Sequence, residues 1–139
     1  MNMDVIKLPF NQFIGLEYSD NPLYLLMLGD KPEYCNHLGT LHASAQFALA
    51  EATSGHYLLE QFTEISGIIP VVRKVNVKYR KPTVGIIYSA AKLLDTEKAA
   101  FIETLNLKGR GLLHVEVCLF NTEGTLIMQA VFEWFISKT

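Results

Sequence analysis

A helix running from Leu41 through Gly55 to Leu59 would have almost no polar face. Small and apolar side chains recur there at helical spacing, at Ala45, Ala48, Leu49 and Ala52. Thr40 is the expected N-cap, and we expect the helix to weaken near Gly55. Because a helix that is apolar nearly all round must be enclosed, the sequence predicts either one antiparallel sheet curling around it or an α+β layer that pairs with a second copy.

Most of the remaining sequence is strand-like. Apolar or alternating segments bounded by turn-forming residues predict strands at 13–18, 23–28, 71–79, 85–94, 112–120 and 125–136. Residues 121–124 are the expected turn of a hairpin between the last two strands. A second, short helix over 97–108 starts at Asp95-Thr96 and ends at Gly109. The sequence therefore predicts a mixed α+β fold with a small helix before the last two strands.

The strand expected at 71–79 alternates between apolar and polar residues. One face is mostly apolar and carries Val71, Arg73, Val75, Val77 and Tyr79. The sequence therefore predicts that this strand covers the core with its odd-numbered residues.

Length and charge restrict the class of protein. The 139 residues are the size of one domain, which we assign to 1–139. The formal net charge of −2 does not indicate a protein that binds nucleic acid. No apolar run approaches the ~20 residues that a membrane-spanning helix needs. The first residues lack the features of a signal peptide. We therefore expect a soluble, cytoplasmic protein that binds neither nucleic acid nor membrane, with Cys35 and Cys118 reduced.

Charged residues make up 19% of the chain, below the roughly 25% of an average globular protein. A small domain with so few charges is expected to hide part of its surface in an oligomer. We predict a homodimer, and a homotetramer built from two dimers is compatible with the same composition.

Glu51 stands among alanines and leucines in the apolar helix. A buried carboxylate is costly unless it is paired, hydrogen-bonded or protonated, and such costs concentrate at functional sites. The alternative interpretation places Glu51 on an exposed strip of the helix.

Asn36 and His42 are the polar residues that would accompany Glu51 in a site. His42 and Glu51 point to opposite sides of one helix and lie ~13 Å apart along its axis, so they cannot meet within one subunit. Two antiparallel helices across a dimer would bring Glu51 of one chain to the helix start of the other. Backbone N–H groups there, at Ala43 above all, could hold a carbonyl oxygen as it becomes an oxyanion, with Glu51 as base or nucleophile.

Two other kinds of site find little support. Cys35, His37 and His42 lack a second clear pair of metal ligands, so we expect no metal. A serine hydrolase is not indicated, because no G-x-S-x-G motif is present. Lys78, Arg80 and Lys81 cluster at a strand end, where they are either solvated or a clamp for phosphate groups.

The helix-start pattern resembles that of the hot-dog thioesterases of the phenylacetate-degradation type. Asn36, His42 and Glu51 stand at the spacing of the Asn, His and acid in that family's motif, and "YRKPTVG" (79–85) resembles its Tyr-x-x-Pro-x-x-Gly strand ending. The segment 101–136 resembles one branch, described as tetrameric acyl-CoA thioesterases, and the likeness extends from Gly15 onward. It implies a curved antiparallel sheet wrapped around one long central helix.

The resemblance also implies an activity, hydrolysis of the thioester of an acyl-CoA or an acyl carrier protein. Asn36 and the Ala43 N–H would polarise the carbonyl, Glu51 of the partner subunit would act on water or carbon, and coenzyme A would enter only as part of the substrate. Ser44, with Lys78, Arg80 and Lys81, would contact that substrate.

Two positions depart from the family's pattern, and they keep other functions open. Ala43-Ser44 replaces the usual Gly-Gly, and Glu51 stands where Asp is more common. Ser44 narrows access to the helix start, and the extra methylene of Glu51 moves the carboxylate by ~1.5 Å, which can cost ~10²-fold in rate. A non-catalytic acyl-CoA or lipid-binding module is therefore the alternative function. A hot-dog dehydratase is a weaker one, because its hydration motif is not found.

Overall fold

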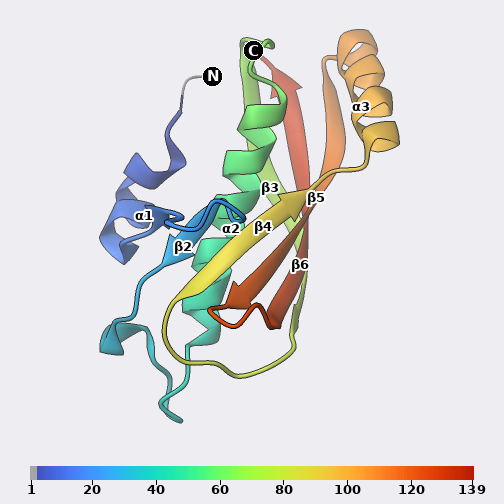
Figure 1. Ribbon diagram of the computed structural model, residues 1–139. Coiled ribbons are helices and arrows are strands. Elements are labelled where there is room, and N and C mark those ends of the chain that lie inside the picture. The colour runs from blue at the N-terminus through green and yellow to red at the C-terminus, as the bar shows by residue number, and fades with distance from the viewer. Residues whose placement is uncertain (1–2) are drawn as a thin grey trace.

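The computed structural model describes residues 3–139 and contains one six-stranded antiparallel sheet (Figure 1). The strands are β1 (Glu17–Tyr18), β2 (Leu26–Leu28), β3 (Ile68–Tyr79), β4 (Ile87–Lys92), β5 (Arg110–Asn121) and β6 (Leu126–Lys138). Their order across the sheet is β1-β2-β4-β5-β6-β3, so β3 is an edge strand although it lies in the middle of the sequence. The expected hairpin is confirmed as β5 and β6, paired along nearly their whole length.

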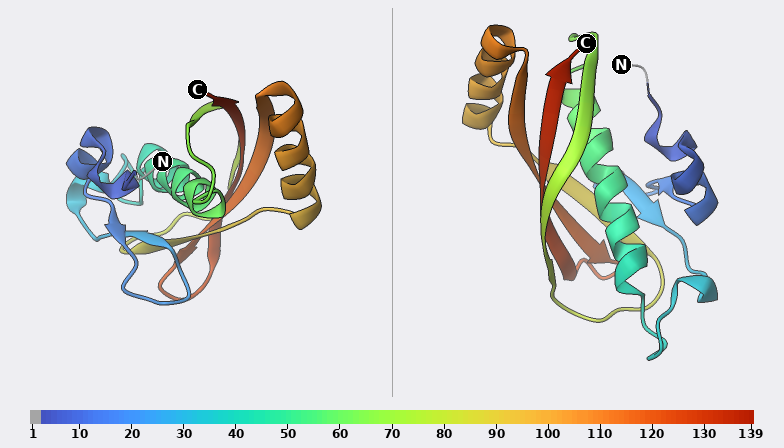
Figure 2. Two further views of the ribbon diagram at one scale, coloured as in Figure 1. Left: turned by 90° about the horizontal axis from the view of Figure 1, so that it is seen from above. Right: turned by 180° about the vertical axis from the view of Figure 1, so that it is seen from behind.

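Three α-helices accompany the sheet: α1 (Pro9–Ile14), α2 (Ala43–Gln61) and α3 (Asp95–Lys108). Single 3₁₀ turns lie at η1 (Val5–Lys7) and η2 (Pro32–Tyr34). The sheet curves around α2, and η1 with α1 covers a side of α2 that the sheet leaves open (Figure 2). The prediction of a curved sheet wrapped around one long helix is confirmed. Among the described residues, no helix has the length and apolar character to cross a membrane.

The enclosure of α2 extends to its small polar side chains. Gln46, Thr53 and Ser54 are all buried. The Thr53 hydroxyl lies 2.7 Å from the carbonyl of Leu49 and 2.6 Å from the hydroxyl of Ser89 on β4. These buried hydroxyls satisfy one another inside the core, so α2 has no polar face apart from its two ends and the position of Glu51.

Both ends of α2 differ from the prediction. The helix begins at Ala43, with His42 and not Thr40 as its N-cap. Leu41 is still extended, because its N–H donates to the carbonyl of Thr83 and it forms a bridge with Cys35. The helix does not weaken at Gly55, because Leu58 on the following turn is fully buried and holds it to the core.

The N-terminal strand predicted at 13–18 is wrong in its first half. Residues Pro9–Ile14 form α1, and only Glu17–Tyr18 is strand. Pro9 suits the first position of a helix, and Gly15 ends it at a φ of 88°, in the left-handed region that glycine readily adopts. In a segment as short as Pro9–Ile14, the spacing of apolar residues cannot distinguish a short helix from a strand.

The predicted face of β3 is correct only after a bulge. Val72 pairs with Trp134 and Lys74 pairs with Glu133, so Arg73 is an extra residue in β3. Before the bulge the even-numbered Val72 faces inward, and Val71 is 54% exposed. After the bulge the odd-numbered Val75 and Val77 face inward. The predicted strand thus has its odd-numbered residues inward only from Val75 onward.

Helix α3 forms as predicted between Asp95 and the left-handed Gly109. It lies beside the part of β5 that β4 does not reach, because β4 pairs with β5 only as far as Glu116 (Figure 1). Phe101 and Leu105 are buried, and Phe101 packs against Phe62 at the end of α2. The small helix therefore takes the place of β4 along the first half of β5.

Candidate active site

Glu51 lies at the middle of α2 and is half-buried. Burial alone raises the pKa of its carboxyl above the usual value. Within residues 3–139, no hydrogen bond or ion pair offsets that burial. The side chain lies between two hollows of the surface and lines both of them. An unpaired carboxylate in this setting is poised to take up a proton.

The first hollow, here called the helix-start hollow, has a volume of about 420 Å³. Its walls are Phe10 of α1, Tyr79 of β3 and one face of α2 at Ala43, Ser44, Phe47, Ala48 and Glu51. Ser44 and Glu51 are seven residues apart, which places them on the same face of the helix with two turns between them. The structure therefore gathers Ala43, Ser44 and Glu51 around one hollow of a single chain.

The start of α2 offers one free backbone donor beside this hollow. The Ser44 N–H donates to Nδ1 of His42 at 2.9 Å, so His42 caps the helix. Ala43 is the first helical residue, and its N–H has no hydrogen bond among the described residues. Its position is the positive end of the helix dipole. The Ala43 N–H is thus available to an oxygen of a ligand.

Tyr79 also lines this hollow, although the sequence indicated it only as the start of the Tyr-x-x-Pro-x-x-Gly strand ending and not as a site residue. Its hydroxyl donates to the carbonyl of Ala43 at 3.3 Å, and burial raises its pKa. The predicted alternation along β3 already placed Tyr79 on the apolar face, on the same side as Val75 and Val77, although its side chain is 47% exposed.

Asn36 does not reach the hollow. Its side-chain oxygen accepts from the N–H groups of Leu38 and Thr40, at 2.9 and 3.1 Å. Its side-chain nitrogen donates to the Thr40 hydroxyl at 2.9 Å. In this structure Asn36 therefore closes the loop before α2, and its predicted role toward a substrate carbonyl stays a prediction.

The structure does not bring the basic residues of the β3 end to Glu51. Arg80 donates to the side chain of Gln129 at 2.8 Å. Lys78 pairs with that same residue across the strands and lines a shallow outer hollow of the sheet. Lys78 lies on the face of β3 opposite to Tyr79, and Arg80 directly follows the end of the strand. Lys81 follows the end of the strand and is exposed, so a phosphate clamp by these residues stays a prediction.

The second hollow, here called the apolar cavity, lies on the other side of Glu51 and has a volume of about 380 Å³. It is lined by α2, the first half of β3, Trp134 of β6 and the N-terminal segment, and it opens to the surface at Ile69 and Val71. Its walls include Leu8, Leu59, Ile69 and Val72. Glu51 therefore stands between a helix start with a free donor and an apolar cavity.

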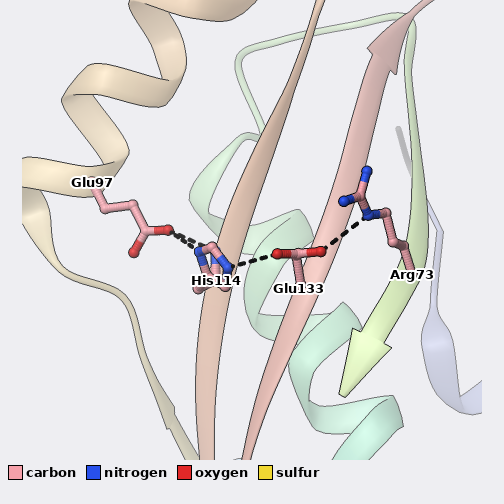
Figure 3. Close-up of polar contacts among 4 residues, drawn as sticks. All are labelled: Arg73, Glu97, His114 and Glu133. Atoms are coloured by element: carbon pink, nitrogen blue, oxygen red, sulfur yellow. Dashed lines mark hydrogen bonds and ion pairs between the residues drawn. The ribbon is translucent and has the colours of Figure 1, made fainter. Parts of the chain in front are cut away.

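Four charged or ionisable residues that line neither hollow form a separate cluster (Figure 3). Glu97 of α3 accepts from the backbone N–H of His114 at 2.8 Å and contacts its Nδ1 at 2.7 Å. Nε2 of His114 lies 3.1 Å from Glu133, which also binds Arg73 at 3.0 Å. The hydrogen bond to Glu97 is the main cause that raises the pKa of His114. This cluster ties α3 to β5 and β6.

We expect the cluster to stabilise the protein more at acidic than at alkaline pH. A raised histidine pKa contributes stability that is complete below its usual value of ~6.5 and is lost as the pH rises through the raised value. His114 is 44% exposed, so we expect His114→Gln to lower the Tm by only about 1–3 °C at pH 6 and by less at pH 9. Thermal denaturation at both pH values tests this, and an equal loss at both would contradict it.

Several solved structures share this architecture. A protein of unknown function from Pseudomonas aeruginosa, described as a probable thioesterase, has a TM-score of 0.80 at 22% identity, over 97% of this chain and 91% of its own. A thioesterase from Haemophilus influenzae has a TM-score of 0.72 at 16% identity, over 96% and 86%. A Bacillus halodurans protein with bound CoA has a TM-score of 0.65 at 18% identity, over 80% and 69%.

The sequence also matches a known protein family. No curated protein matches the chain. The model of a domain of unknown function, DUF4442, matches residues 20–136. The curved sheet, the enclosed α2 and the likeness to solved thioesterases confirm the resemblance stated from the sequence. The chain therefore belongs to the DUF4442 family and has the hot-dog fold.

Proposed function

We propose that this protein is an acyl-CoA thioesterase in which Glu51 acts on the thioester. The observation that carries the proposal is the half-buried, unpaired carboxylate of Glu51, on a helix whose start also presents the free N–H of Ala43. Structures of the same fold that are described as thioesterases support it, as does one that holds CoA.

The chemistry follows from the two groups. The thioester carbonyl oxygen accepts a hydrogen bond from a helix-start N–H, which stabilises the oxyanion as it forms. Glu51, acting as base, takes a proton from a water molecule while the oxygen of that water bonds to the carbonyl carbon. The carbon–sulfur bond then breaks, and the proton passes from Glu51 to the departing sulfur. The products are a carboxylic acid and free coenzyme A.

One chain does not supply both groups to one carbonyl. Ala43 and Glu51 are eight residues apart on α2, which is ~12 Å along the helix axis. A carbonyl oxygen held at hydrogen-bond distance from the Ala43 N–H leaves its carbon too far from Glu51 of the same chain. We therefore propose that the working site combines Glu51 of one chain with Ala43 of a second copy.

The free edge of β3 is the surface through which two copies would pair. β3 has 12 residues and is the last strand of the sheet. Ile69 and Val71 on it are exposed, at 44% and 54%. Long edge strands with apolar side chains pair readily with another chain. Antiparallel pairing about a two-fold axis would continue the sheet and bring the two α2 helices to the same side of it. A tetramer of two such dimers stays a prediction.

We expect the wild-type protein to sediment as a dimer or a dimer of dimers, and Val71→Glu to shift it to the monomer. A charge at this edge would be desolvated on pairing. Val131→Glu is the matched control, because Val131 is also exposed but lies on β6, which is paired with a strand on both sides and has no free edge. Sedimentation velocity measures the mass of each form. A wild-type monomer, or a Val71→Glu protein that stays dimeric, would contradict pairing through β3.

The direct test of the proposed function is release of free thiol from a panel of acyl-CoAs with short, medium, long and aromatic acyl groups. Turnover that requires Glu51 supports the proposal. Tight binding of acyl-CoA without turnover would instead favour the non-catalytic binding module.

A further inference from the structure

The apolar cavity beyond Glu51 follows α2 for two turns. Glu51, Ala52, Gly55 and Leu59 form one wall of it, and the distance from Glu51 to Leu59 is ~12 Å along the helix axis. β3 and Trp134 form the facing wall. A group that starts at Glu51 and enters this cavity therefore runs along the helix and away from the helix-start hollow.

Gly55 keeps this cavity open. It lies in the interior of α2, where glycine is less favourable than alanine. Its backbone is not in the left-handed region. A Cβ added there would meet only carbon atoms of the Trp134 ring, at 3.6 and 3.7 Å, which is ordinary contact. Neither backbone conformation nor crowding requires glycine here, and its main structural effect is the space left in front of Trp134.

The chemistry of the walls indicates what fills that space. They are largely apolar, and the amide of Asn11, one of the few polar groups there, already donates to the carbonyl of Val5 at 2.9 Å. Volumes of a few hundred Å³ with such walls suit the apolar part of a small ligand. Each methylene buried there would strengthen binding about fourfold.

We propose that the apolar cavity holds the acyl chain of the substrate and that Gly55 sets the chain length the protein accepts. The inference rests on the proposed thioester chemistry at Glu51, because Glu51 lines both this cavity and the helix-start hollow. The thioester carbonyl would lie at Glu51, and the methylenes would pass Gly55 toward Leu59.

Gly55→Met tests this proposal. Methionine is a good helix former, so the helix is expected to remain intact, while the longer side chain occupies the space before Trp134. We expect kcat/KM for decanoyl-CoA, relative to that for butanoyl-CoA, to fall at least tenfold, with no loss of Tm. Ala99→Met is the matched control, because Ala99 is exposed on α3; its ratio is expected to equal that of the wild type.

Trp134 provides a second readout that does not depend on turnover, since it is the single tryptophan of the chain and lines the cavity. We expect S-decyl-coenzyme A, a thioether that cannot be hydrolysed, to change its fluorescence, and coenzyme A alone to leave it unchanged. Gly55→Met is expected to weaken the response at least tenfold.

The outcomes separate this inference from the proposed function. An unchanged chain-length ratio in Gly55→Met, with hydrolysis still dependent on Glu51, would overturn the acyl site and leave the thioesterase in place. A response of Trp134 to S-decyl-coenzyme A that Gly55→Met weakens, in a protein that hydrolyses no thioester, would support the acyl site and reject the thioesterase. No response to the thioether would overturn the acyl site.

Discussion

Glu51→Gln is expected to lower kcat for acyl-CoA hydrolysis about 10³-fold and, at pH 7, to raise the stability of the protein. The amide is nearly isosteric with the carboxylate, so it fills the same place between the two hollows. It cannot accept the proton of the attacking water. The loss of rate is therefore expected in kcat, with little change in the affinity for the substrate.

The gain in stability has the same physical origin as the raised pKa. Burial disfavours the charged form of Glu51 and nothing among the described residues offsets it, so the neutral amide removes a cost on the order of 1 kcal/mol. We expect a rise in Tm of about 3–5 °C. Because the folded-state pKa is raised, Glu51 favours the folded state at acidic pH, and this contribution is lost as the pH rises through the raised value. The Tm difference is therefore expected to vanish near pH 4 and to appear at pH 7.

Thiol release and differential scanning fluorimetry across pH measure both effects. Glu60→Gln is the matched control on the same helix, since the Glu60 side chain is 62% exposed and pairs with His56. It is expected to keep wild-type hydrolysis. In the wild type, kcat is expected to rise with pH through a midpoint above the usual glutamate value of ~4.3. Full activity in Glu51→Gln would reject Glu51 as the base.

The sequence predicted the elements whose signals are local and strong. The apolar α2, the stop of α3 at Gly109 and the hairpin of β5 and β6 each follow from periodicity and turn residues within the element. The wrong predictions depend on distant contacts. Leu41 stays extended because Thr83 holds its N–H, and the bulge at Arg73 appears only in the register between β3 and β6.

The candidate site was predictable to the same degree. Glu51 could be identified from the sequence because burying a carboxylate in an enclosed apolar helix costs free energy. Asn36 and Arg80 were less predictable, because spacing does not tell whether a polar side chain serves a ligand or its own neighbours, and both have partners in this chain. The role inferred for Gly55 depends on the Trp134 ring opposite it, which the sequence does not place.

Ala43→Pro is expected to lower kcat by about 10²–10³-fold and to leave the fold intact. Proline removes the backbone N–H of Ala43, the donor proposed for the oxyanion. It is tolerated at the first position of a helix, and His42 before it already has the extended backbone, at φ −65° and ψ 140°, that a following proline requires. The rate is therefore expected to fall while circular dichroism and Tm stay close to those of the wild type.

Asp95→Pro is the matched control, because Asp95 is also the first residue of a helix and follows an extended residue, Leu94. It tests whether proline at such a position is harmless in this chain, and we expect wild-type hydrolysis. Wild-type rates in Ala43→Pro would show that the Ala43 N–H does not bind the oxyanion.

Mixing the two inactive variants then tests where the site is formed. If Glu51 of one chain works with Ala43 of its partner, a heterodimer of Glu51→Gln with Ala43→Pro contains one site in which both groups are intact. Equal amounts, unfolded and refolded together, are expected to recover about a quarter of wild-type activity in a two-fold symmetric dimer. If both groups belonged to one chain, every site in the mixture would lack one of them, and activity would stay at the level of the separate variants. Recovery therefore requires a site shared between subunits, which is the arrangement that the ~12 Å between Ala43 and Glu51 on one helix demands.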